Sequence, residues 1–466
     1  MVSYQKGGLI MKKKTTVIVS LFTAILVAGT ASACSFGNPA VYDDTSPYEI
    51  ATEQGFDGTE SSWLASVSGG AGSTAVREAY DAAKEEGYEG SFLDFLQLYL
   101  TLTTDDSVGL NRALTSAVSV WAQFTELTTT GGGYMRPTTT TSEVTSMGAG
   151  VIYSLDKEAG NALVVTNYHV IYDKASVGTE TVAHVSDKIS LYLYGGEHSA
   201  RAISATFLGG AMDFDIAVLK VEGSAVLKDS SATAVVGANS DAVTVGERVY
   251  AVGNPEGEGL SAVGGIVSVD AEYITISTSD ESRTVSLLEI RTDAPVNHGN
   301  SGGGLFNADG ELLGIVNART EETGVDAFGY AIPANLALSV AQNIIDNADS
   351  GARGAFCATL GITTTVTDSK SVYHEENGKV YVEETVGISA VSAGSPAHGN
   401  LQSGDIIYSV EVEGKAPLII TRQHQLRTFM MGVRKGQSVR FVVSRNGEQV
   451  TEYVEFDDNS DFTLYN

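Results

Sequence analysis

A serine in a glycine-rich turn is the residue of this chain best suited to act as a nucleophile. Ser301 stands in the run Gly299-Asn300-Ser301-Gly302-Gly303. Flanking glycines permit backbone conformations that point amide groups into one small space, where they hold the oxyanion formed when a serine attacks a carbonyl carbon. We expect Gly299 and Ser301 to supply such amides, with Asn300 between them in the same oxyanion hole. The motif indicates acyl transfer, although glycine-rich turns also occur in purely structural loops.

A general base and its orienting acid stand upstream of this serine. His169 follows the apolar run 162–165, and Asp215 directly precedes the apolar run 216–219. Histidine is the side chain whose ordinary pKa suits proton transfer near neutrality, and a buried carboxylate can fix its tautomer. Taken alone, the histidine could be structural and the aspartate a strand cap. The order His, Asp, Ser on a chain rich in strands favours a catalytic triad.

Two nearby residues compete for these roles. Asp213 is the rival of Asp215, but Asp215 stands directly before the buried strand. His298 lies only three residues before Ser301, which is too close for the usual geometry of base and nucleophile. We therefore expect His298 to be a loop residue.

Composition limits the classes of protein and partner. The chain has 466 residues, 43% of them hydrophobic and 18% charged, so it can bury two or three cores. Its formal net charge of -29 repels phosphate backbones, which excludes nucleic acid as an expected partner. The two cysteines, Cys34 and Cys357, provide no disulfide framework, and we expect Cys357 to be a buried apolar residue. No cysteine or histidine pair has metal-ligand spacing, so we expect no metal and no cofactor.

Residues 1–33 have the layout of an export signal. Three lysines at 12–14 precede the apolar run 17–28, and small residues follow as far as Cys34. Residues 32–34 resemble the lipid-attachment site of bacterial lipoproteins. We favour lipid attachment at Cys34, with ordinary cleavage after Ala33 as the alternative. The protein is expected to be exported, either anchored to the cell membrane as a lipoprotein or secreted.

The rest of the chain divides into four segments by composition. Residues 34–72 are polar and acidic and predict a flexible tether, and residues 73–104 predict a short helical hairpin. Residues 105–349 carry many short β-branched runs, which predict a β-sandwich or a pair of barrels closed by a helix at 333–349. The threonine-rich stretch 128–145 is expected to be a loop. Residues 355–466 predict a smaller unit of strands with one helix.

Several motifs resemble the trypsin-like proteases of the high-temperature-requirement (HtrA) family. The matching segments, in order, are 166–170, 215–220, 252–255 with 264–268, 292–303 and 329–333. The resemblance implies a mainly β fold with a chymotrypsin-like double β-barrel and the site in the cleft between barrels. It implies Ser301 as nucleophile, His169 as base and then acid, and Asp215 as orienting group.

The chain departs from the family pattern beside the nucleophile. His298 and Gly304 stand where the family commonly has proline, so we expect this loop to need ordering before it acts. Pro295 and Val296 stand where trypsin has the acid that selects basic residues. The resemblance therefore favours apolar side chains at the cleaved bond.

The C-terminal segment resembles a PDZ domain through 359–362, 392–397, 401–407 and 433–437. Such a domain adds an extended peptide to a sheet edge as a further strand. The resemblance implies that amides of the Leu360-Gly361-Ile362 loop hold a terminal carboxylate and that a helix at 421–431 lines the groove.

These observations predict an exported serine endopeptidase that cleaves misfolded or exposed proteins, with the PDZ-like domain for peptide recognition or regulation. Its expected partners are protein or peptide substrates and C-terminal peptides. A homo-trimer is one assembly that the resemblance allows. The alternatives are a catalytically silent binding protein or chaperone and a surface adhesin, and the intact His169, Asp215 and Ser301 argue against the former.

Overall fold

The structure is a computed structural model that describes Lys84 and residues 106–130, 138–177, 180–196, 201–319, 328–375 and 377–466. The expected export signal, Cys34, the tether and, apart from Lys84, the helical hairpin lie outside these described residues. The chain divides into two compact units between Val108 and Gly109, and the second unit is the one described below. Within the described ranges, no helix is both long enough and apolar enough to cross a membrane.

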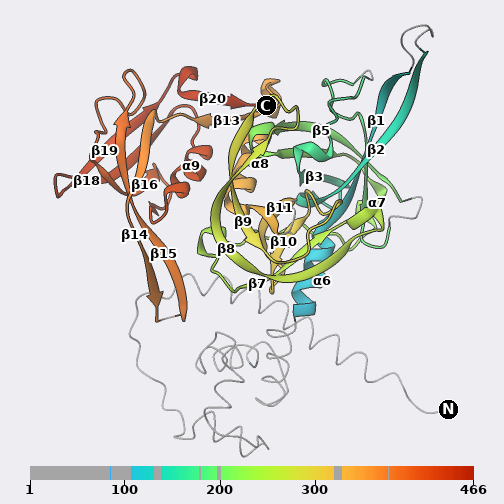
Figure 1. Cartoon of the computed structure of the whole chain (residues 1–466), viewed down its shortest axis with the longest axis horizontal. Helices are drawn as coiled ribbons and strands as arrows, with labels where there is room; N and C mark the ends of the chain where they lie inside the picture. Colours follow the sequence, from blue (N-terminus) through green and yellow to red (C-terminus); the bar gives the residue numbers. More distant parts are fainter. Residues whose placement is uncertain are drawn as a thin grey trace, which may run out of the picture. The chain divides into compact units, whose positions relative to one another are not determined.

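Six antiparallel strands close into a first barrel (Figure 1), and helix α6 (Asp106–Ser116) precedes them. The strands are β1 (Ala117–Thr130), β2 (Thr138–Asp156), β3 (Asn161–Thr166), β4 (Lys188–Leu193), β5 (Ile203–Ala211) and β6 (Ile216–Val221). The order is β1-β2-β3-β6-β5-β4, and β1 pairs with both β2 and β4, which closes the barrel. Strand β6 is buried at every position except Lys220, because its side chains pack both inside and outside the barrel wall.

A second closed barrel follows, in the order β10-β11-β12-β9-β8-β7. Its strands are β7 (Arg248–Gly253), β8 (Ser261–Ser277), β9 (Thr284–Thr292), β10 (Gly304–Asn307), β11 (Leu312–Arg319) and β12 (Gly329–Pro333). The short helix α7 (Ala225–Lys228) connects the barrels, and α8 (Ala334–Asn347) follows the second. The expected mainly β class with two barrels is confirmed.

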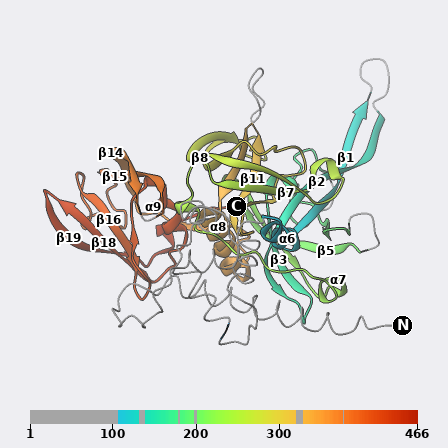
Figure 2. The same cartoon turned by 90° about the horizontal axis from the view of Figure 1, so that it is seen from below.

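The described parts of the threonine-rich stretch, residues 128–130 and 138–145, are strand rather than loop, which corrects the expectation from sequence for these residues. β1 runs to Thr130 and β2 starts at Thr138, with these two residues opposite each other in the ladder. Figure 2 shows the two strands continuing as a long hairpin beyond the barrel. Threonine is β-branched and favours extended backbone, so a run of threonines extends the strands even without apolar alternation.

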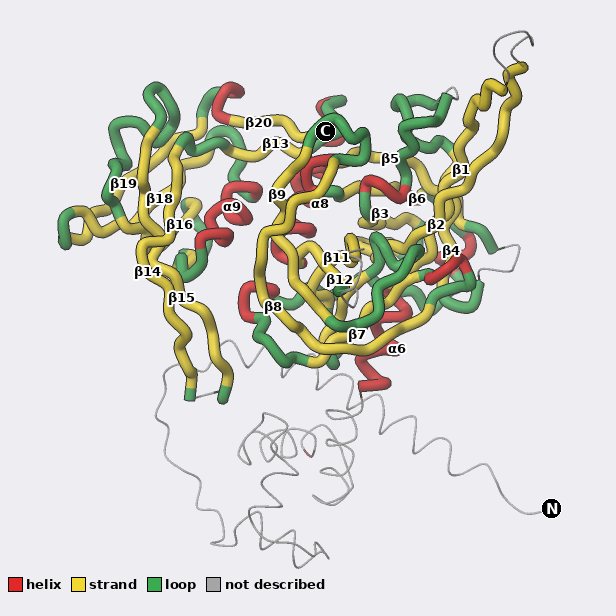
Figure 3. The backbone as a smooth tube through the Cα atoms, viewed as in Figure 1, coloured by secondary structure: helices red, strands yellow, loops and turns green. Residues whose placement is uncertain are grey.

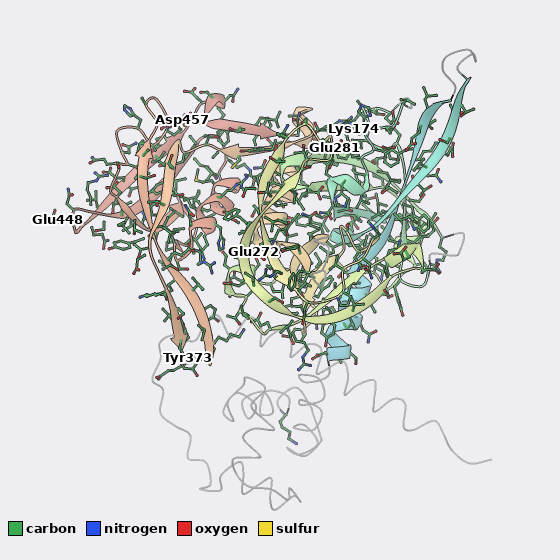
Figure 4. All side chains as sticks on the ribbon, in the orientation of Figure 1. Lys174, Glu272, Glu281, Tyr373, Glu448 and Asp457 are labelled. Atoms are coloured by element: carbon green, nitrogen blue, oxygen red, sulfur yellow. The ribbon has the colours of Figure 1, made fainter. Side chains whose placement is uncertain are left out.

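The C-terminal segment forms a separate sheet with one helix, α9 (Gln423–Met431) (Figure 3). Its strands are β14 (Ile362–His374), β15 (Lys379–Val391), β16 (Ile406–Val412), β17 (Leu418–Ile419), β18 (Gln437–Arg445) and β19 (Glu448–Phe456). Strand β14 is at the edge of this sheet, and its far end carries the exposed Tyr373 (Figure 4). Strand β13 (Ala355–Ala358) pairs with the last strand, β20 (Phe462–Tyr465).

A buried ion pair holds the turn before β16 in this C-terminal sheet. The Asp405 side chain is 1% exposed and receives two hydrogen bonds from Arg445, each of 2.8 Å. Burial opposes ionisation of Asp405, but the hydrogen bonds and charge of Arg445 outweigh burial and hold its pKa below the ordinary value. This stabilisation is therefore present at neutral pH and is lost only as the pH falls through the lowered pKa.

Replacing Asp405 is expected to destabilise the C-terminal sheet. Asp405→Asn removes one partner of a buried pair and should cost about 3 kcal/mol of unfolding free energy. Hydrogen exchange of the β16 and β18 amides at neutral pH measures this loss. Asp457→Asn, at the exposed acid that directly follows β19 (Figure 4), is the control and should leave exchange unchanged. Equal protection in the two variants would contradict the importance of the pair.

Candidate active site

His169 is positioned by a sharp change of direction at the end of β3. The chain leaves the strand at Thr166 and enters the single-turn 3-10 helix η1 (Tyr168–Val170). The Tyr168 amide and the Asn167 side-chain amide both donate to the carbonyl oxygen of Asp215, at 3.1 and 2.9 Å. These two bonds tie the histidine segment to the aspartate segment through the main chain.

Asp215 lies between the 3-10 helix η2 (Met212–Phe214) and β6, in the left-handed region with φ 48°. A non-glycine residue in this region is strained, so its neighbours must hold it there. The carboxylate accepts the His169 main-chain amide at 3.0 Å and contacts His169 Nδ1 at 2.6 Å. The aspartate side chain is 7% exposed and the imidazole 40%, so the pair presents the other ring nitrogen to solvent.

The aspartate determines the protonation of the imidazole. Burial disfavours the charged ring, but the charge and hydrogen bond of Asp215 outweigh burial and raise the pKa of His169 above its ordinary value. An imidazole held in this way accepts a proton at Nε2 and is stabilised once it carries the charge.

Ser301 lies where the two barrels meet. Its carbonyl oxygen accepts the Ala149 amide of the first barrel at 2.9 Å, and the next amide, of Gly302, donates to Val316 of the second barrel at 2.8 Å. His169, Asp215 and Ser301 line one cleft of about 370 Å³. The structure thus brings together the three residues that the sequence singled out.

The Ser301 hydroxyl makes its hydrogen bond away from the histidine. Its Oγ donates to the main-chain carbonyl oxygen of Asn317 at 3.1 Å, and within the described residues it makes none to His169. Asn317 belongs to the cleft wall. A rotation about the serine side chain is needed before the imidazole can take the proton.

Two glycines are required for this turn by close backbone contacts. Gly299 has φ 94°, and a Cβ there would lie 2.0 Å from the carbonyl oxygen of Asn254. Gly302 has φ 83°, and a Cβ there would lie 2.3 Å from the Ala149 carbonyl oxygen. Any side chain at either position would push the nucleophile away from its barrel contacts.

Two amides are available as an oxyanion hole. In the described part of the chain, the amides of Gly299 and Ser301 donate to no protein atom. The Asn300 amide donates to the Asn297 carbonyl oxygen at 3.0 Å, so the expectation that Asn300 belongs to the hole is corrected. The Asn300 amide closes the turn, and the amides of Gly299 and Ser301 point in other directions.

The nucleophile loop is held from outside by the 3-10 helix η4 (Pro255–Gly257). The Asn254 amide donates to the Gly299 carbonyl and the Glu256 amide to the His298 carbonyl, both at 3.0 Å. The His298 side chain is exposed at the rim of the cleft. It therefore stands as a loop residue, as the sequence predicts.

Asp213 has its own partner and is outside the triad. Arg283 holds its carboxylate by two hydrogen bonds, Nε to Oδ1 at 2.9 Å and Nη2 to Oδ2 at 2.7 Å. Arg283 ends the turn between β8 and β9, where Lys174 also pairs with Glu281 at 3.0 Å (Figure 4). This turn contributes Ser279 to the cleft wall. The ion pair between Arg283 and Asp213 therefore holds both this part of the wall and Asp213, which is two residues before Asp215.

Phe214, between the two aspartates, is fully buried. The Tyr465 ring packs edge-on against it at 5.1 Å, and the Arg427 guanidinium lies 4.9 Å from its ring centre. Both contacts come from the segment after residue 355. The strained backbone of Asp215 is therefore buttressed by an aromatic residue that two other elements hold.

No motif in the sequence pointed to Asn317, Arg283 or Glu289. Glu289 is fully buried on β9 and accepts a hydrogen bond from the Asn317 side chain at 2.7 Å. An acid inside the apolar run Leu287–Ile290 is the one signal that could have identified it. Asn317 acts here through a main-chain oxygen, which has no sequence signature.

The Leu360-Gly361-Ile362 segment leads into edge strand β14, whose first residue is Ile362. In the described residues the amides of Leu360 and Gly361 donate to no protein atom. Gln423 of α9 donates to Thr364 of β14 at 2.9 Å, so the helix lies beside this strand.

Outside these sites, burial raises the pKa of the Cys357 thiol to about 11, which fits the expected buried residue. The described part of the chain contains no group of three or more His, Cys, Asp or Glu side chains able to hold a metal ion.

Comparisons with known proteins match this part of the chain. Residues 148–315 match the family model of a trypsin-like peptidase domain, and they include His169, Asp215 and Ser301. The chain is 32% identical to Serine protease Do-like HtrA of Lactococcus lactis subsp. cremoris (strain MG1363) over 323 residues, covering 67% of this chain and 71% of that relative.

A second relative and one solved structure are also similar to this chain. Periplasmic pH-dependent serine endoprotease DegQ of Escherichia coli (strain K12) is 32% identical over 315 residues, which cover 67% of this chain and 59% of that relative. Among solved structures, HtrA-type protease AlgW with decapeptide aligns with a TM-score of 0.44 and 25% identity, covering 77% of this chain and 98% of that chain.

The His169 imidazole is expected to titrate above its ordinary pKa, because Asp215 favours the charged ring. NMR titration of the ring should give a midpoint above 6.5, with His169→Asn used to assign the resonance. In Asp215→Asn the midpoint should fall, since the compensating charge is lost while burial remains. An unchanged midpoint in that variant would show that the carboxylate does not control the ring.

Proposed function

The chain belongs to the HtrA family of serine proteases, and we propose that this serine endopeptidase acts through Ser301 as nucleophile, His169 as general base and acid, and Asp215 as orienting carboxylate. The observation that carries the proposal is the double attachment of His169 to Asp215 at 3.0 and 2.6 Å, in the cleft that also contains Ser301. Without that attachment, the ring would have neither a fixed tautomer nor a fixed direction.

The reaction begins when the Ser301 hydroxyl leaves the Asn317 carbonyl and turns to His169 Nε2. The imidazole takes the proton as Oγ attacks the carbonyl carbon of the scissile peptide, and the resulting oxyanion lies against the amides of Gly299 and Ser301. Each such donor is worth roughly a hundredfold to a thousandfold in rate. The imidazolium, stabilised by Asp215, then protonates the leaving amine, which departs and leaves an acyl-enzyme.

Water completes the cycle by the reverse sequence of proton transfers. His169 removes a proton from a water molecule, whose oxygen attacks the acyl carbon. The second tetrahedral intermediate uses the same two amides, and its collapse returns the proton to Ser301 Oγ. Bonds and protons balance without any group beyond the protein and water.

The walls of the cleft favour apolar side chains beside the cleaved bond. Met212, Ile276 and Val296 line it together with the triad. The apolar residues of a substrate protein are mostly buried when it is folded and become exposed when it unfolds. We propose misfolded or exposed proteins as the substrate class.

The C-terminal sheet and α9 are proposed to be a PDZ domain that recognises C-terminal peptides. The unpaired edge of β14 offers main-chain partners for an added strand, with α9 beside it. The unoccupied amides of Leu360 and Gly361 stand at the start of that edge and suit a terminal carboxylate. This recognition supplies or regulates substrates.

We also propose that the protein is exported. The proposal is supported by the signal-like layout of residues 1–33 and by the Escherichia coli relative, which is named as a periplasmic endoprotease. Lipid attachment at Cys34 and a homo-trimer are proposed on the resemblance alone. Mass spectrometry of the mature N-terminus tests the first, and sedimentation of the full chain tests the second.

Loss of the nucleophile is expected to abolish proteolysis. Ser301→Ala should lower the rate of casein cleavage by about four to six decades, because removing a triad member removes nucleophilic catalysis. A fluorophosphonate should label the natural chain at Ser301 only. The control Ser279→Ala changes another serine of the cleft wall and should retain activity. Substantial cleavage by Ser301→Ala would contradict the proposed mechanism. Cuts by the natural chain mainly after basic residues would contradict the proposed preference for apolar side chains.

Peptide binding at the C-terminal sheet is expected to need a free carboxylate. Amidating the C-terminus of a bound peptide should weaken its binding at least about tenfold, since hydrogen bonds to the charged group are lost. Gly361→Ala should do the same, because its Cβ would lie 2.1 Å from Ser395 Cβ. Gly447→Ala is the matched control: its φ is also positive, at 87°, but no atom lies within 4 Å of its Cβ. Calorimetry that found equal affinity for free and amidated peptides would exclude carboxylate capture.

A further inference from the structure

A buried carboxyl stands behind the cleft wall with no part in the mechanism above. Glu289 is 0% exposed, and its neighbours on β9, Leu287 and Ile290, are equally buried and apolar. An acid in such a place is costly because its charged form loses its hydration. An apolar residue there would avoid that cost, so a specific task is the better explanation for Glu289.

The carboxyl has one partner, and that partner belongs to the cleft. The Asn317 side-chain amide donates to Glu289 Oε1 at 2.7 Å. The other oxygen, Oε2, is buried and has no hydrogen-bond partner among the described residues. Burial raises the pKa of Glu289 well above its ordinary value, and the nearby charge of Asp215 adds to this despite the Asn317 hydrogen bond. The surroundings of Glu289 therefore disfavour the charged form of its carboxyl.

Asn317 occupies an irregular position that needs such support. The pairing of β11 with β12 shifts register between Val316 and Ala318, which leaves Asn317 outside the ladder. A bulge of this kind re-aims one residue and leaves it without its usual strand partners. The Asn317 carbonyl consequently faces the cleft, where it receives the Ser301 hydroxyl at 3.1 Å.

We propose that Glu289 is a positioning residue of the active site, because its carboxyl holds the Asn317 side chain and so fixes the carbonyl on which the Ser301 hydroxyl rests. This inference rests on the proposed function of Ser301 as nucleophile. Without Glu289 the Asn317 side chain loses its hydrogen-bond acceptor. Both the cleft wall at Asn317 and the resting position of the Ser301 hydroxyl then become less well defined. Small displacements at reacting groups cost large factors in rate.

Three variants test whether Glu289 acts by holding the Asn317 side chain. Glu289→Leu removes the acceptor and should lower kcat for peptide hydrolysis by about tenfold to a hundredfold, with KM changed less than threefold. Glu289→Gln keeps a neutral oxygen at the same reach and should recover most of that loss. Ile290→Val, a small cavity on the same strand, controls for general loosening and should leave kcat unchanged. All rates are measured below the unfolding midpoint of every variant.

A double-mutant cycle tests whether Glu289 acts through Asn317. Asn317→Ala should lose about as much rate as Glu289→Leu, and adding the second change to the first should cost less than a further threefold. Additive losses would overturn the proposal, because Glu289 would then act by another route. Equal losses in Glu289→Gln and Glu289→Leu would also overturn it, in favour of a role for charge.

Fluorophosphonate labelling distinguishes a failure of this inference from a failure of the triad. The labelling rate at Ser301 should fall in Glu289→Leu in parallel with kcat. Label at a residue other than Ser301 in the natural chain would contradict the proposed nucleophile itself. Label at Ser301 with an unchanged rate in Glu289→Leu would contradict only the role of Glu289.

Discussion

One hydrogen bond between the barrels, from the Ala149 amide to the Ser301 carbonyl, sets the geometry on which the site depends. The base and its carboxylate come from the first barrel, and the nucleophile comes from the loop that enters β10 of the second. Thr166, at the end of β3, donates its hydroxyl to the Ala149 carbonyl at 2.7 Å. Ala149 therefore contacts both the nucleophile and the strand that leads to His169. A displacement between the barrels would change the distance between base and nucleophile directly.

Asp215, Asp405 and Glu289, which are buried in the described part of the chain, face three different kinds of partner. Asp215 accepts the His169 main-chain amide and contacts the His169 imidazole. Asp405 remains charged because Arg445 provides two hydrogen bonds. Among the described residues, Glu289 faces the Asn317 amide and the charge of Asp215, and its pKa is raised. Burial disfavours ionisation of both Asp405 and Glu289, so the donors that face each of these two groups decide the direction in which its pKa moves.

Sequence motifs identified those parts of the site in which a side chain or a glycine is required. His169, Asp215 and Ser301 meet in one cleft, and the family resemblance is confirmed. Main-chain contributions were harder to predict: which amide of the turn is free depends on the hydrogen bond from Asn300 to Asn297.

Long-range and register effects were also beyond the sequence. The Arg283 partner of Asp213 is 70 residues away, and no local pattern links the two. Residues 128–130 and 138–145 were mistaken for loop because their threonines provide no apolar alternation. Cross-strand pairing of Thr130 with Thr138 determines the hairpin of β1 and β2, and it is a property of two segments rather than one.

The position of the Ser301 hydroxyl indicates which kind of step activates the enzyme. His298 and Gly304 led us to expect a loop that needs ordering, yet two amides of the η4 segment already hold the loop at Gly299 and His298. The amides proposed for the oxyanion are unoccupied, so no peptide unit has to turn. What remains is rotation of one side chain from Asn317 toward His169, between staggered positions separated by a small barrier. Such rotations take picoseconds to nanoseconds, far faster than loop rearrangements, so activation at the nucleophile itself would not limit turnover.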